Sequence, residues 1–120
     1  MKYLLMIYGN DELWSSFPPE VFEEVVRDTN ALQAELRESG EFIGAWGVGG
    51  QELAKCVHLD NGVPAVTDGP YIEAKEYLGS LDIIDVESEE RALEIAARVP
   101  FARVGKVEVR PLLHEAAEEI

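Results

Sequence analysis

The segment KYLLMIY, residues 2–8, is a continuous apolar run that ends at Gly9. Such a run is typical of a β-strand that is buried on both faces. A second segment, SLDIIDV at residues 80–86, is also apolar on both faces near its centre. We therefore expect these two segments to form the two middle strands of a sheet.

Between these two strands the sequence predicts a long amphipathic helix. Pro18 and Pro19 suit the start of a helix, and Gly40 after Ser39 is typical of its end. Residues at helical spacing form one stripe, which comprises Phe22, Val25, Val26, Thr29, Leu32, Gln33 and Leu36. Residues 9–18, before the helix, are predicted to be a loop.

Two further β segments follow the helix. Residues 41–48 predict a strand with one face formed by Phe42, Gly44, Trp46 and Val48. Asn61 and Gly62 both tolerate the positive φ angles of a tight type I′ turn. Segments 52–60 and 63–68 are therefore predicted to form a β-hairpin around them.

The C-terminal third predicts a second helix and a last strand. Ser88 is a good N-cap for a helix over residues 89–98, whose buried stripe would be Ala92, Leu93, Ala96 and Ala97. Residues 106–113 alternate between apolar and polar side chains and predict a strand. We assign residues 1–112 to one domain and residues 113–120 to an acidic tail.

The predicted order is strand, helix, strand, hairpin, strand, helix, strand. Without the hairpin this is the split βαβ, or ferredoxin-like, arrangement of an α+β fold. Its two helices cover one face of a four-stranded antiparallel sheet. The apolar second face must also leave water, because its burial is worth about 25 cal/mol per Å². We expect a homodimer through the sheet faces; the alternative is that the hairpin or the tail covers that face.

Composition limits the partners of this chain. It has 120 residues, which fit one domain, and 10 Lys+Arg against 24 Asp+Glu give a formal net charge of −14. This excess of acidic residues argues against binding to nucleic acid and to anionic membrane surfaces. Cys56 is the only cysteine, so no intramolecular disulfide can form, which suits a reducing cytoplasm. No apolar run approaches the roughly 18 residues of a membrane span.

The segment VTDGPYIEAKEYLG, residues 66–79, is the strongest candidate for a site in the sequence. A stiff segment at the end of a central strand can hold the carboxylate of Asp68 or Glu73 toward a cleft. Lys75 is close enough in sequence to keep that carboxylate ionised or to bind an anionic substrate. We therefore predict Asp68, Glu73 and Lys75 as catalytic residues. The alternative is a rigid connector without chemistry.

The shape of such a cleft would come from stiff backbone and aromatic side chains. Glycine permits unusual φ angles and proline fixes them. Large apolar side chains in a loop fit a cleft better than a core, whereas Trp46 in its predicted strand fits a core. The predicted substrate-binding residues are Gly69, Pro70, Tyr71, Trp14 and Phe17.

The sequence gives little support for a metal site or for a cysteine nucleophile. Cys56, His58 and Asp60 point to one side of their predicted strand, but this spacing is too wide for them to share one ion. The other histidine, His114, lies near the C-terminus. We expect no metal site, no cysteine nucleophile and no organic cofactor, because GVGG at residues 47–50 lacks the features of a phosphate or dinucleotide loop.

The run VTDGPYIEAKEYLGSLDIIDVES resembles the DGPF signature of the YCII-related proteins, with Tyr71 where the family usually has Phe. The segments MKYLLMIYG, LRESG and VEVRP are similar to that family as well, so the resemblance extends from Met1 to about Leu112. It implies a dimeric α+β barrel in which two ferredoxin-like sheets pack face to face. It also implies bacterial, cytoplasmic proteins that are often encoded beside extracytoplasmic-function sigma factors.

For YCII relatives the resemblance implies a His–Asp acid/base pair, with the His on the first helix. This chain has no His between Pro19 and Gly40, and Thr29 or Asn30 falls about where that His would lie. Two functions therefore stay open. The first is a small-molecule enzyme of lyase or isomerase type that acts without an organic cofactor in a cleft between sheet and helices. The second is a non-catalytic ligand-binding or accessory module linked to sigma-factor regulation.

Overall fold

The computed structural model describes residues 1–115 and contains one mixed α+β domain. The main strands and helices follow the chain in the order β1 (Lys2–Gly9), α1 (Asp11–Ser15), α2 (Pro19–Ser39), β2 (Phe42–Gly47), β3 (Lys55–Asp60), β4 (Val63–Asp68), β5 (Tyr77–Asp85), α3 (Glu89–Arg98) and β6 (Lys106–Pro111). Two 3₁₀ turns, η1 (Gln51–Leu53) and η2 (Pro100–Arg103), lie between them.

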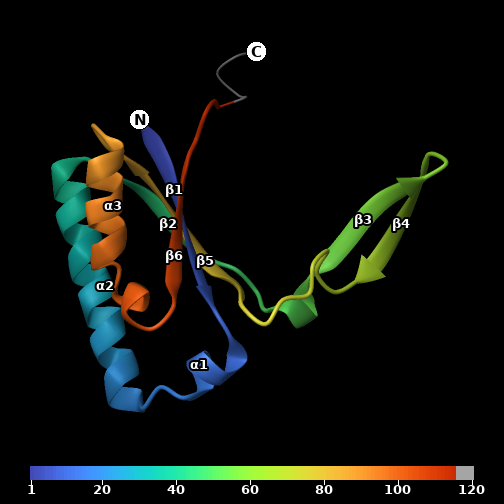
Figure 1. Ribbon diagram of the computed structural model, residues 1–120, viewed down its shortest axis with the longest axis horizontal. Coiled ribbons are helices and arrows are strands. Elements are labelled where there is room, and N and C mark those ends of the chain that lie inside the picture. The colour runs from blue at the N-terminus through green and yellow to red at the C-terminus, as the bar shows by residue number, and fades with distance from the viewer. Residues whose placement is uncertain (116–120) are drawn as a thin grey trace.

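Four strands form an antiparallel sheet in the order β2-β5-β1-β6, and β3 pairs with β4 in a separate hairpin. With α2 and α3 as the crossovers, this is the predicted split βαβ connectivity. Figure 1 shows both helices on one face of the sheet, while the β3–β4 hairpin projects away from it. The prediction that β1 and β5 occupy the centre of the sheet is confirmed.

The core lies between the sheet and the two long helices. Tyr3, Leu5 and Ile7 alternate along β1 and are buried, and they meet buried side chains of α2 and α3 such as Leu36 and Ile95. Each fully buried side chain of this size contributes about 1.5–3 kcal/mol.

The second face of the sheet is not buried within one chain. Leu4, Met6 and Tyr8 are only half-buried, so the predicted burial of β1 on both faces holds for one face of the single chain. The hairpin does not cover this face, because it points away from the sheet (Figure 1). Residues 116–120, most of the predicted tail, lie outside the described residues.

Local signals explain the element ends. Gly40 ends α2 with a φ angle of 81°, and the Ser88 side chain accepts a hydrogen bond from the Arg91 backbone N–H at the start of α3. Asn61 and Gly62 take φ angles of 51° and 83°, which confirms the predicted hairpin turn.

Several predicted details are wrong. Residues 9–18 contain the short helix α1, which Asn10 caps by accepting a hydrogen bond from the Leu13 backbone N–H. On α3, Ile95 is buried, whereas Leu93 and Ala97 are exposed. The predicted last strand ends at residue 111 instead of 113.

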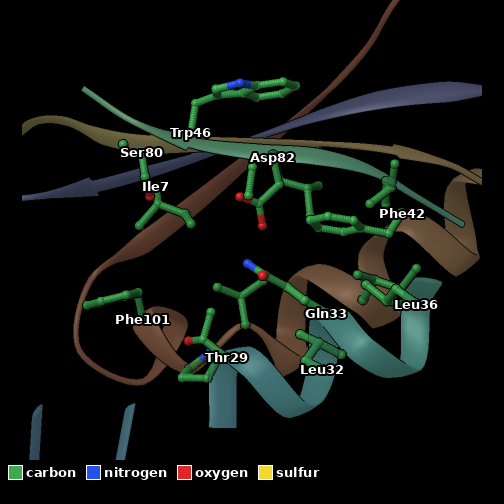
Figure 2. Close-up of a pocket in the computed structure, with 17 residues that line it drawn as sticks. Ile7, Thr29, Leu32, Gln33, Leu36, Phe42, Trp46, Ser80, Asp82 and Phe101 are labelled. Atoms are coloured by element: carbon green, nitrogen blue, oxygen red, sulfur yellow. The ribbon is translucent and has the colours of Figure 1, made fainter. Parts of the chain in front are cut away.

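The predicted face of β2 is also wrong. The register shifts between Phe42 and Gly44, so Phe42 faces the helices while Trp46 lies on the opposite side of the sheet (Figure 2). Trp46 is 51% exposed and is not a core residue of the single chain. No helix in the described part of the chain is long and apolar enough to cross a membrane.

Candidate functional site

A pocket of about 220 Å³ lies between the sheet and the helix layer. Most of its wall is apolar and includes Leu5, Leu32, Leu36, Ile84 and Phe42. Figure 2 shows four polar side chains among the labelled lining residues, namely Thr29, Gln33, Ser80 and Asp82. We call this cavity the Asp82 pocket.

Strand pairing places Asp82 in the pocket. Asp82 lies opposite Leu5 of β1 and Ala45 of β2, so it takes the helix-facing side on which Leu5 and Ile84 are buried. The alternation of β5 therefore directs a carboxyl group to a position where a core residue would normally sit. Figure 2 shows this carboxyl group pointing into the cavity.

The pocket exists because small residues occupy the edge strand. Ala45 and Gly47 of β2 pair with Asp82 and Ser80 of β5, and both contribute little side-chain volume on the helix-facing side. Larger residues at these two positions would fill the space in front of Asp82.

Burial changes the acidity of Asp82. Desolvation raises the pKa of its carboxyl group to about 6, because a charge loses hydration in the apolar pocket. Within residues 1–115, no hydrogen bond or ion pair offsets this cost. The group can therefore gain or lose a proton close to neutral pH.

Helix α2 places two polar side chains across from Asp82. Thr29 and Gln33 are four residues apart, so they lie one above the other on the same helix face. The Thr29 hydroxyl is buried and has no hydrogen-bond partner. Figure 2 shows the Gln33 amide directed toward Asp82. Because buried polar groups are normally paired, these open groups favour a site that is completed by a bound molecule or by water.

The sequence-predicted catalytic residues lie elsewhere. Asp68, Glu73 and Lys75 line one open, polar hollow of about 630 Å³ together with Gly69 and Pro70. This hollow is at the base of the hairpin and not between the sheet and the helices.

Two contacts hold this connector in place. The carboxylate of Asp68 pairs with Lys55 on the adjacent strand, whereas the sequence suggested Lys75 as its partner. The Gln51 side chain donates a hydrogen bond to the Ala74 carbonyl at 3.2 Å. Tyr71 is 90% exposed and does not line this hollow.

Trp14 and Phe17 lie at a third location, apart from the hollow at Asp68. They line an apolar hollow of about 440 Å³ with Phe22, Tyr77 and Phe101. The structure thus brings together the charged residues of the predicted site but separates them from the predicted aromatic residues.

Sequence reasoning missed the Asp82 pocket, although signals for it were present. Thr29 and Gln33 are polar residues within the apolar stripe of α2, and Asp82 interrupts an apolar strand. On the hairpin, the Cys56 thiol donates a hydrogen bond to the Gly69 carbonyl at 3.4 Å. No three His, Cys, Asp or Glu side chains among residues 1–115 are grouped closely enough to hold a metal ion.

The fold and the pocket define a small α+β protein with a cavity between its sheet and its helices. The family model described as YCII-related domain matches residues 1–116, so the chain belongs to this family. The chain is also 32% identical over 114 residues to an uncharacterised protein of Rhizobium meliloti (strain 1021), with 93% of this chain and 92% of that protein covered.

Proposed function

We propose that this protein binds a small organic molecule in the Asp82 pocket and that the Asp82 carboxyl group exchanges a proton with it. The observation that carries this proposal is a half-buried carboxyl group in the pocket that has no hydrogen-bond or ion-pair partner among residues 1–115, and its pKa of about 6 suits proton transfer near neutral pH. Thr29 and Gln33 would orient the ligand through the hydroxyl and the amide. The reaction class is an isomerase or lyase type of proton transfer without an organic cofactor.

A non-catalytic role is the second candidate. In YCII relatives the resemblance implies a histidine on the first long helix, which is α2 in this chain. Thr29 lines the pocket from that helix. A threonine hydroxyl does not titrate near neutral pH, and among the described lining residues Asp82 is the only acid or base. A site with one titratable group favours a ligand-binding or accessory module, such as one linked to sigma-factor regulation.

We propose the hollow at Asp68, Glu73 and Lys75 separately as a second candidate catalytic site. These three side chains line the same space, which supports joint action on a polar ligand. If Asp68 transfers a proton, Asp68→Asn abolishes turnover. If it only shapes the connector through Lys55, turnover persists.

We also propose that two copies pair through their uncovered sheet faces, as in a dimeric α+β barrel. The half-buried side chains of β1 and the exposed Trp46 support this arrangement. Apolar faces of this kind mark interaction surfaces in soluble proteins.

Native mass spectrometry of gently purified protein tests the proposed function. We expect the wild type to retain a small molecule and Asp82→Asn to retain less than a tenth of it. Asp60→Asn, on the exposed hairpin, serves as the matched control and should behave like the wild type. Equal retention by Asp82→Asn would overturn the proposal, and conversion of the identified compound by wild type alone would favour the enzyme over the accessory module.

A further inference from the structure

A second compartment adjoins the Asp82 pocket. Ile7, Ser80 and Phe101 line both the Asp82 pocket and the apolar hollow that contains Trp14. Figure 2 shows these three residues at one end of the pocket, opposite Phe42. We call the adjoining hollow the aromatic compartment; its aromatic walls are Trp14, Phe17, Phe22, Tyr77 and Phe101.

The aromatic wall is held in a fixed arrangement. The Trp14 ring packs edge-on against Phe101, with centroids 5.4 Å apart, and lies 6.3 Å from Phe17. A Cβ atom at Gly9 would lie 2.1 Å from the Trp14 ring, so only glycine leaves room for the indole there. The Tyr77 hydroxyl donates a hydrogen bond to Asp11, which ties the start of α1 to the start of β5.

The charge of the two compartments limits the ligand. Among the described residues, no Lys, Arg or His lines either space, and Asp82 is the only acidic lining residue. An anion would therefore be buried beside a carboxylate without a counter-charge, which is costly. An amine or hydroxyl group would instead donate to Asp82.

We propose that the ligand of the Asp82 pocket is an uncharged or cationic molecule with an aromatic body. Its donor group lies at Asp82 and Gln33, and its ring lies in the aromatic compartment. This inference rests on the proposed function and adds the ligand class. The two compartments, of about 220 and 440 Å³, together fall within the range that small-molecule sites occupy, roughly 300–1,000 Å³.

Three probes with one shared body test this inference: 2-phenylethylamine, 2-phenylethanol and phenylacetate. Each is titrated into the full chain at a pH above the pKa of Asp82, with calorimetry for Kd and NMR for the two indole N–H signals. We expect the amine and the alcohol to bind, and phenylacetate to bind at least tenfold more weakly. The Trp14 signal should shift more than that of Trp46, which also borders the Asp82 pocket but whose ring lies on the opposite side of the sheet.

Variants separate the two compartments. Asp82→Asn should weaken the binding of the amine at least tenfold and that of the alcohol less, because only the amine loses a charge partner. Trp14→Leu should weaken the binding of both the amine and the alcohol. If the leucine variant does not fold, Trp14→Phe is the variant to use. Asp60→Asn should leave all three affinities unchanged.

Each outcome decides a different point. Phenylacetate binding as tightly as the amine would overturn the charge preference. Binding that depends on Asp82 but not on Trp14 would overturn the aromatic compartment and leave the proposed function intact. If no probe binds, this inference fails, and retention of a ligand by the wild type but not by Asp82→Asn decides separately whether the proposed function stands.

Discussion

Asp82 makes the stability of this protein depend on pH in an unusual direction. Its folded-state pKa of about 6 lies above the ordinary aspartate value of about 3.9, so the folded state holds the proton more tightly than the unfolded state. The contribution of Asp82 to the free energy of unfolding is therefore largest below about pH 4 and is lost as the pH rises through about 6.

We predict that Asp82→Asn raises the free energy of unfolding at pH 8 by about 1–2 kcal/mol, a value lowered to allow for partial exposure of the carboxyl group. At pH 4 the variant and the wild type should differ little. Urea unfolding over this pH range measures the difference, and the exposed Asp60→Asn is the control. An equal effect at pH 4 and pH 8 would show that Asp82 does not titrate in between.

Gly9 has no space for a side chain. We predict that Gly9→Ala destabilises the protein by about 1–3 kcal/mol, because its Cβ atom would displace the rigid indole of Trp14. The matched control is Gly47→Ala, since a Cβ atom there meets nothing within 4 Å. Urea unfolding and tryptophan fluorescence report stability and ring position, and similar losses in both variants would refute the steric explanation.

At the scale of residues, the sequence predicts the position of a side chain on its own helix better than its contacts with other elements. The spacing of Thr29 and Gln33 places them on the buried stripe of α2, and the pocket confirms that position. The role of Asp82 escaped prediction because its burial depends on strand register across β1, β2 and β5. The sequence instead indicated the polar segment around Asp68 as the site, although the Asp68 carboxylate pairs with Lys55 on the surface.

At the scale of elements, one ion pair joins three of them. Glu41, between α2 and β2, accepts two hydrogen bonds of 2.9 Å from the Arg91 guanidinium on α3. The hydrogen bonds from Arg91, and then Ser39, lower the pKa of Glu41 to about 2 against the opposing effect of burial. The pair therefore fixes the start of β2, the edge strand that borders the Asp82 pocket.

We predict that Glu41→Gln lowers the free energy of unfolding by about 1–2 kcal/mol at pH 7, because it removes a bidentate, charge-assisted contact. The folded-state pKa is depressed, so this stabilisation is present above about pH 4.5 and is lost as the pH falls toward about 2. Chemical unfolding between pH 7 and pH 3 measures it. The exposed Glu38→Gln on α2 is the control, and a difference from wild type that does not decrease between pH 7 and pH 3 would contradict the assignment.

Elements with local signals were predicted well. The ends of α2, the N-cap of α3 and the hairpin turn depend on nearby residues, and the structure confirms all three. The helix α1 was missed because five residues give no helical period, and its main local sign is the Asn10 cap. The face of β2 was wrong because a register shift cannot be deduced from alternation alone.

At the scale of the whole molecule, large apolar side chains are exposed on both the sheet and the hairpin. The open face of the sheet carries Met6 and Leu81 opposite Trp46. The hairpin adds Val57, Leu59 and Val66, which are each more than 60% exposed. A two-stranded hairpin is only marginally stable alone in water, so a second copy that covers both surfaces would stabilise sheet and hairpin together.

We predict that Trp46→Glu converts a wild-type dimer into a monomer, because the new carboxylate would be buried against a partner that carries the same excess of acidic residues. Leu93 on α3 is also 51% exposed, like Trp46, but lies on the helix side, so Leu93→Glu should leave the dimer intact. Light scattering after size exclusion measures the mass across a concentration series. A monomeric wild type would refute pairing through the sheet faces, and a dimer that dissociates only in Leu93→Glu would move the interface to the helices.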